Sequence, residues 1–184
     1  MNLHIVVAIA RDENCDLLIR ELQRARGQVQ HVWPLPDRLP EDADVIYCDL
    51  MPGLPDRLPW IPGAPKSALV VTIPAAPPPD LGLLRNCSPD ALLHRPFATH
   101  AVLASLVLAM SRFKYEQRLR GRIDKLDETL RTVHCVERAK SILAVKERIS
   151  EEDAYNYMRR QAMTRRVSIG AVAAAVVDSH ELLG

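Results

Sequence analysis

Residues 136–183 read VERAKSILAVKERISEEDAYNYMRRQAMTRRVSIGAVAAAVVDSHELL, and this stretch indicates three short helices. Its apolar residues recur every three or four positions, as expected for helices with one buried face. Ser150 followed by three acidic residues is typical of a helix start, because a hydroxyl caps the first turn and acids suit its positive end. A third helix is expected to begin after Ser168. Helices this short bury a common face only by packing together, so we expect a small three-helix bundle.

The middle of the same stretch carries a local basic cluster. No acidic residue occurs between Ala154 and Val177, whereas that window holds four arginines: Arg159, Arg160, Arg165 and Arg166. Guanidinium groups bind phosphate through paired hydrogen bonds and stack on unpaired bases, so the cluster is a candidate nucleic-acid contact. On charge alone, an ordinary solvated helix face is the commoner explanation. The whole chain has 24 Lys and Arg against 23 Asp and Glu, so no global field would attract nucleic acid.

Three sequence blocks in this stretch carry a family resemblance: residues 137–143 (ERAKSIL), 152–155 (EDAY) and 158–166 (MRRQAMTRR). Together, in one register, they resemble the ANTAR domain of bacterial transcription antitermination regulators. The resemblance implies binding to paired hairpins with small loops in nascent leader mRNA, which prevents an overlapping terminator from forming. On this hypothesis the RNA contacts are the four arginines, with Lys140 reaching a phosphate and Met163 lying against a base.

The first half of the chain is divided from the second by its prolines. All fourteen lie between Pro34 and Pro96, so long helices are expected only after that region. An amphipathic helix is predicted over residues 15–26, between two short apolar runs, and this order favours a parallel sheet with right-handed crossovers. We therefore expect an α/β doubly wound sheet that has lost some of its helices. The predicted strands are residues 3–8, 28–32, 45–48, 68–73 and 91–93.

A second resemblance is carried by residues 44–53 (DVIYCDLMPG), by Thr72 and by Arg95-Pro96-Phe97. These residues resemble the receiver domain of response regulators, with Asp49 in the place of the phosphorylatable aspartate and Thr72 in that of the receiver's hydroxyl. Arg95 stands where the receiver has a lysine. The resemblance implies that residues 1–98 form a receiver-like domain.

The magnesium-binding acids of a receiver are missing from this domain. Ile9 and Ala10 stand where the acidic pair belongs, and Asp12 and Glu13 come too late in the register to replace it. Phosphoryl transfer to a carboxylate needs a metal ion to neutralise charge, so we expect Asp49 to be phosphoacceptor-like but inactive. A pseudo-receiver with an ANTAR tail is similar to antiterminators of the aliphatic-amidase type, which implies control by a ligand-sensing regulatory protein.

Between the two regions a long helix is expected to begin near Thr99. Its apolar residues after Arg112 alternate in steps of four and three, which is a heptad seam. Such a seam is hard to satisfy without a partner helix, so residues 99–133 predict a parallel homodimer, with the RNA-binding helical domain at residues 134–184. The alternative is a lone surface helix on a monomer. The seam residues are Leu119, Ile123, Leu126, Leu130 and Val133.

Other classes of function find less support in the sequence. It has no catalytic constellation, no phosphate-binding glycine loop and no metal-ligand spacing among its four cysteines, so no enzyme, metal or cofactor is expected. The first apolar run is too short to cross a membrane and follows no leader, so a cytoplasmic protein is expected. Two alternatives stay open: a phosphorylation-controlled response regulator with Asp49 as acceptor, and a protein-interaction module without nucleic acid. DNA binding ranks below RNA binding, because no helix-turn-helix pattern emerges.

Overall fold

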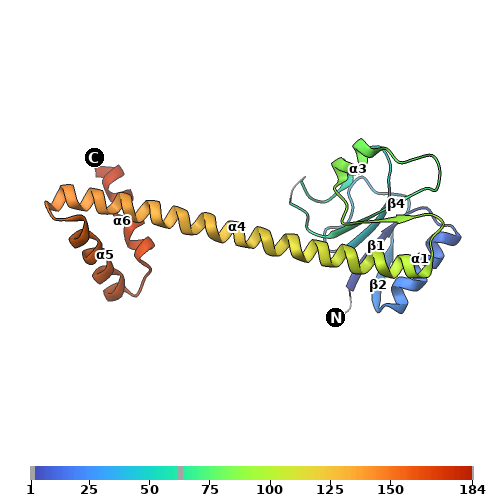
Figure 1. Cartoon of the computed structure of the whole chain (residues 1–184), viewed down its shortest axis with the longest axis horizontal. Coiled ribbons are helices and arrows are strands. Elements are labelled where there is room, and N and C mark those ends of the chain that lie inside the picture. The colour runs from blue at the N-terminus through green and yellow to red at the C-terminus, as the bar shows by residue number, and fades with distance from the viewer. Residues whose placement is uncertain (1–2, 62–63, 184) are drawn as a thin grey trace. The chain divides into compact units, whose positions relative to one another are not determined.

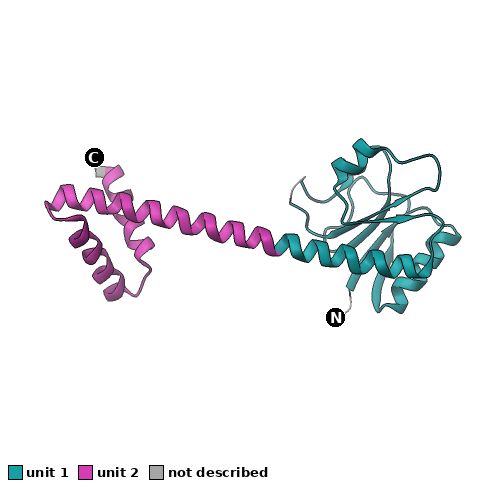
Figure 2. Cartoon of the chain, viewed as in Figure 1, with its two compact units in different colours: residues 1–117 teal, residues 118–184 magenta. Residues whose placement is uncertain are grey.

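The structure is a computed structural model that describes residues 3–61 and 64–183. By packing, the chain forms two compact units, residues 1–117 and 118–184, and the boundary falls within the long helix α4 (Thr99–Glu147) (Figure 2). The predicted domain boundaries after residues 98 and 133 divide the chain by function and not by packing, and they stay a prediction. Among the described helices, none combines the length and the apolar character that crossing a lipid bilayer requires.

The first unit is built on a five-stranded, fully parallel sheet with strand order β2-β1-β3-β4-β5 (Figure 1). This order confirms the predicted doubly wound α/β fold. Its register places Asp49 beside Thr72, where β3 and β4 end. The strands are β1 (Leu3–Ala8), β2 (Gly27–His31), β3 (Val45–Asp49), β4 (Ala68–Ile73) and β5 (Ala91–His94).

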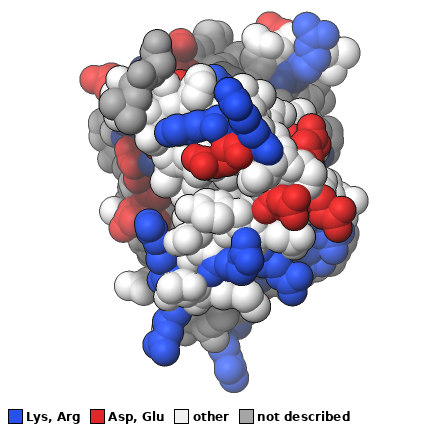
Figure 3. Space-filling view, turned by 90° about the vertical axis from the view of Figure 1, so that its left-hand side faces the viewer, with Lys and Arg blue, Asp and Glu red and all other residues white. Residues whose placement is uncertain are grey.

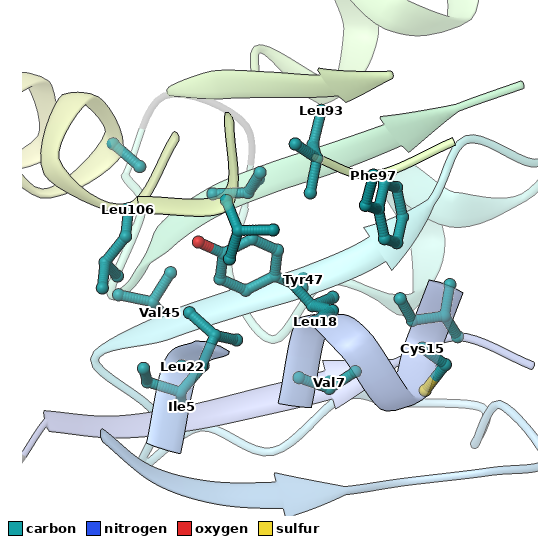
Figure 4. Close-up of a cluster of buried hydrophobic side chains, with 14 of the residues drawn as sticks. Ile5, Val7, Cys15, Leu18, Leu22, Val45, Tyr47, Leu93, Phe97 and Leu106 are labelled. Atoms are coloured by element: carbon teal, nitrogen blue, oxygen red, sulfur yellow. The ribbon is translucent and has the colours of Figure 1, made fainter. Parts of the chain in front are cut away.

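Helices and loops cover both faces of this sheet. Odd-numbered side chains of β1 and β3 pack with α1 (Glu13–Arg24) and the first turns of α4, and this cluster surrounds Tyr47 in Figure 4. Even-numbered side chains of the same strands pack with α2 (Leu54–Arg57), α3 (Leu81–Cys87) and the proline-rich loops. Because both faces are covered, the central strands are apolar along their length, as parallel strands usually are.

Helix α1 begins earlier than the predicted range 15–26. The Asp12 side chain caps it, since the backbone amide of Cys15 donates to Asp12 Oδ1 at 2.7 Å, and the first helical residue is Glu13. The helix also ends two residues before the predicted boundary, and β2 begins as early as Gly27. Strand β2 is therefore shifted by one residue from its predicted position.

The second unit is a three-helix bundle made by the end of α4, α5 (Glu151–Arg165) and α6 (Ile169–Leu183). Both short helices start where the sequence predicted, and the Ser150 hydroxyl accepts the Asp153 amide at 3.0 Å as the cap of α5. Helix α6 approaches α4 closely at Gly170, where an added Cβ would lie 2.9 Å from Thr132 Cγ2. The bundle core consists of Val136, Ala139, Leu143, Ala154, Met158, Ala173 and Val177.

Candidate functional site

The four arginines of the basic cluster lie on α5 and at its C-terminal cap, and all four are exposed. None of them forms a salt bridge with any residue in the described part of the chain. Neighbouring basic residues differ in this respect, because Arg138 Nη2 lies 2.7 Å from Glu181 Oε1. The α5 guanidinium groups are therefore available for an external anion.

One side of α5 carries two of these arginines together with other exposed groups. Tyr155, Arg159, Met163 and Arg166 follow one another in steps of four, four and three, so they share a side of the helix. We call these four residues the basic row. Tyr155 is 41% and Met163 69% exposed, so the row offers an aromatic ring and a thioether beside its guanidinium groups. Arg160 points further from the bundle core than the row does, because it lies about 200° around the helix from the centre of the buried side.

Arg165 lies on a different side of α5. It forms a row with Tyr157 and Gln161 at four-residue steps, and we call these three residues the groove row. They line a groove of about 500 Å³ between α5, α6 and the end of α4. Arg165 was predicted to act together with the other arginines, and neither Tyr155 nor Tyr157 was predicted as a site residue. The four-residue spacing of tyrosine and arginine could have separated the two rows.

Lys140 is held by acidic neighbours. Its Nζ lies 2.8 Å from Glu137 Oε2 and 3.4 Å from Glu151 Oε2, and its side chain is only 16% exposed. The hydrogen bond from Lys140 to Glu137 is the main reason that the pKa of Lys140 is raised. These contacts tie α4 to the start of α5. A phosphate contact by Lys140 stays a prediction and requires it to exchange a carboxylate partner for the phosphate.

A second polar site lies at the carboxyl ends of β3 and β4. The Thr72 hydroxyl donates to Asp49 Oδ1, as the receiver-like motif leads one to expect. Arg95 Nη2 lies 3.0 Å from Asp49 Oδ1, and Arg95 Nη1 lies 2.6 Å from Asp12 Oδ2. The guanidinium therefore bridges two carboxylates, and Asp12 is a member of the site that the sequence analysis did not identify.

The charge of Asp12 is stabilised within this site. Partial burial opposes the ionised form, but the Cys15 amide and the Arg95 guanidinium outweigh it and hold the pKa of Asp12 below its usual value. The residues here do not fit a magnesium ion, since the buried Ile9 side chain offers no oxygen, and Arg95 is already paired with Asp12 and Asp49. Within residues 3–61 and 64–183, no group of three or more His, Cys, Asp or Glu side chains could hold a metal.

The predicted seam residues are uncovered in the single chain. They are between 38% and 63% exposed, whereas Val136 and Ala139, which follow on the same helix, are buried in the bundle. A row of exposed leucine, isoleucine and valine on a helix is unfavourable in water unless another surface covers it. The five residues are Leu119, Ile123, Leu126, Leu130 and Val133.

Comparison with known proteins agrees with both resemblances. The family described as AmiR, N-terminal matches residues 3–110, and the ANTAR domain family matches residues 124–177. The two matches together cover the sheet of the first unit and most of the bundle. They place the arginines of α5 inside the ANTAR match.

Individual relatives are regulators. The transcriptional regulatory protein PdtaR of Mycobacterium tuberculosis is 36% identical over 95 residues, 52% of this chain and 46% of PdtaR, so the match spans about half the length of that relative. The aliphatic amidase regulator of Pseudomonas aeruginosa is 25% identical over 185 residues, 99% of this chain and 91% of that protein. The response regulator StyR shares the fold, with 12% identity, a TM-score of 0.52, and coverage of 96% of this chain and 99% of StyR.

Proposed function

This chain belongs to the AmiR N-terminal family of transcription regulators and carries an ANTAR domain, and from that premise we propose that it is an RNA-binding antiterminator. In this proposal it binds hairpins in nascent leader mRNA as a dimer and prevents a terminator from forming. A partner protein controls it through the receiver-like unit. The observation that carries the proposal is the set of four exposed arginines on α5 and its C-terminal cap, which form no salt bridge with any residue that the structure describes.

The chemistry of α5 suits single-stranded RNA. Arg159 and Arg166 offer charge to phosphates, and Tyr155 and Met163 offer flat or apolar surface to bases that have left a helical stack. Base stacking of this kind needs unpaired nucleotides, which hairpin loops supply and duplex DNA does not. The chain is nearly neutral as a whole, so this local surface would provide most of the attraction to nucleic acid.

Dimerisation through the exposed seam would increase affinity for paired hairpins. Two chains joined along α4 present two bundles, and the second hairpin then binds at a high effective concentration. The exposed apolar seam supports the dimer, because pairing would remove those five side chains from water.

Control by a ligand-sensing regulatory protein is supported by the ion pairs around Asp49. Arg95 supplies there, within the chain, the positive charge that a metal ion supplies in a phosphorylated receiver. With Asp49 already paired, a signal has to reach the first unit by another route than phosphorylation. Binding of a second protein to that unit is the route we propose.

The test compares RNA binding by the native chain and by the Arg159→Ala, Arg166→Ala double variant, with a pool of RNA hairpins that have randomised loops as the probe. We expect the double variant to lose roughly tenfold or more in affinity, and the salt dependence to fall by about one unit of slope per arginine. The matched control is Arg85→Ala with Lys114→Ala, which removes the same charge from exposed positions of the first unit.

Two results would contradict the proposal. Equal binding by the double variant and its control would mean that α5 is not the contact surface. No binding of the RNA pool by the native chain would favour the protein-interaction module instead.

A further inference from the structure

The groove in the second unit is a separate feature from the basic row. It has a volume of about 500 Å³ and lies on the opposite flank of α5, between that helix, α6 and the end of α4. Its apolar lining includes Ile142 and Val172, and its polar lining includes Lys146 and the groove row. All of these residues belong to the second unit, so the groove is formed within one compact body.

We propose that this groove holds one unstacked base of the bound RNA, with the adjoining phosphate at Arg165 and Lys146. The inference rests on the proposed RNA-binding function and names the place where a base would be recognised. A nucleobase has two flat apolar faces and an edge of hydrogen-bond donors and acceptors. A site for it needs apolar walls, an aromatic ring and a side chain that both donates and accepts.

Each of these requirements is met by a residue of the groove. Ile142 and Val172 are partly buried, pack against the bundle core and provide an apolar wall. Tyr157 is 43% exposed, so its ring is accessible for stacking. The Gln161 amide carries a donor and an acceptor, which matches the edge of a base.

The charge of the groove fits a nucleotide rather than a neutral ligand. Arg165 and Lys146 both line it, and neither forms a salt bridge with any of the residues that the structure describes. Glu147 is the acidic residue of the lining, so the two cations outnumber it. Figure 3, which faces this end of the molecule, shows both blue Lys and Arg and red Asp and Glu side chains around uncharged white surface. The volume lies within the range of about 300–1,000 Å³ that is usual for small-molecule sites.

The two sides of α5 would then have different roles. The basic row on one side would hold the phosphate backbone, and the groove row on the other side would take the base. An RNA strand that passes over the exposed side of α5 could meet both, because the rows lie on opposite flanks of one helix. Phosphate contacts would supply affinity, and the groove would supply preference among bases.

The experiment fills the groove without removing a polar group. Ala175 lines the groove and is exposed, so Ala175→Phe would occupy the space of a base, whereas Ala75→Phe makes the same change in an exposed loop of the first unit. Two probes are used with the full-length chain: the four nucleoside 5′-monophosphates, followed by NMR of alanine and isoleucine methyl groups, and the pool of RNA hairpins with randomised loops.

We expect at least one monophosphate to shift the methyl signals of Ala171 and Ile142 in the native chain and in Ala75→Phe, but not in Ala175→Phe. We also expect Ala175→Phe to weaken RNA binding roughly tenfold, in line with the loss of one stacked base, and Ala75→Phe to leave it unchanged. If Ala175→Phe does not fold, the pair Tyr157→Phe and Tyr157→Leu decides, since only the leucine variant removes the ring and should weaken binding.

The outcomes separate this inference from the proposed function. Unshifted groove signals, or full RNA affinity in both Ala175→Phe and Tyr157→Leu, would overturn the base site even if the arginine variant loses RNA. Groove signals that shift with a monophosphate, in a chain that binds no RNA, would overturn the proposed function and leave the groove as a nucleotide site.

Discussion

At the scale of single residues, Arg95 pairs with both carboxylates of the polar site in the receiver-like unit. Its guanidinium lies 2.6 Å from Asp12 and 3.0 Å from Asp49. We expect the native chain, incubated with acetyl phosphate and Mg²⁺, to gain no phosphoryl group by intact mass spectrometry. Arg95→Lys should also stay unmodified, because the side chains of Ile9 and Ala10 offer no carboxylate to the metal. A phosphoryl adduct on the native chain that Asp49→Asn removes would contradict this account.

Tyr47 provides a second prediction at this scale. Burial raises its pKa to about 12 from about 10, although the hydrogen bond with Ser105 acts in the opposite direction, and Figure 4 shows its ring within the apolar cluster. The folded pKa is raised, so the stabilising contribution is complete below pH about 10 and is lost as the pH rises from about 10 to about 12. We expect the free energy of unfolding in urea to fall across that interval by roughly 2–3 kcal/mol from this group.

The control for this alkaline loss is Tyr47→Phe, which keeps the ring and removes the titrating hydroxyl. It should be within about 1 kcal/mol of the native chain at neutral pH, because a single hydrogen bond is lost and Ser105 Oγ still donates to the Val102 carbonyl. An equal loss of stability in the native chain and in Tyr47→Phe would show that other groups cause it.

Residues whose role is local were predictable from the sequence, and residues whose role depends on distant partners were not. Asp49 and Thr72 stand in a recognisable motif and at the end of a predicted strand, and they do meet. Asp12 joins them only because Arg95 reaches it across 83 positions of sequence. The spacing of residues along one strand does not indicate a contact between residues so far apart in the sequence.

At the scale of secondary-structure elements, α4 carries the prediction that is easiest to isolate. Leu126 is 63% exposed in the single chain, so Leu126→Asp should leave each chain folded but place a carboxylate in the predicted seam. We expect the native chain to sediment as a dimer and Leu126→Asp as a monomer. Val145→Asp is the control, since Val145 is 81% exposed on the same helix but outside the seam.

The seam hypothesis has a clear contrary result. A native chain that sediments as a monomer at all concentrations would mean that no second chain covers the seam. A Leu126→Asp variant that still sediments as a dimer would mean that the dimer forms through another surface.

Elements with strong local signals were predicted more accurately than elements without them. The Ser150 cap and the apolar period after Ser168 located α5 and α6 correctly. Helix α3 was not predicted, because its seven residues in a proline-rich region are too few to show a helical period. Its start depends on Asp80, whose side chain accepts the amides of Gly82 and Leu83.

At the scale of the whole molecule, one nearly neutral chain combines a receiver-like unit with a bundle whose exposed arginines lie on a single helix. Composition could exclude a global attraction to nucleic acid, and periodicity could predict the fold class of each half. The groove beside α5 could not be predicted, because it is made by side chains from three helices whose packing the sequence does not state. The family to which each unit is assigned follows from the family matches rather than from composition.

The most direct test of RNA binding by α5 is to cross-link the protein to RNA in living cells and to sequence what is attached. We predict enrichment of transcripts in which two adjacent hairpins precede or overlap a terminator, and loss of that enrichment in the Arg159→Ala, Arg166→Ala variant. Attached RNA that is the same for the native chain and that variant, or no attached RNA at all, would contradict the account.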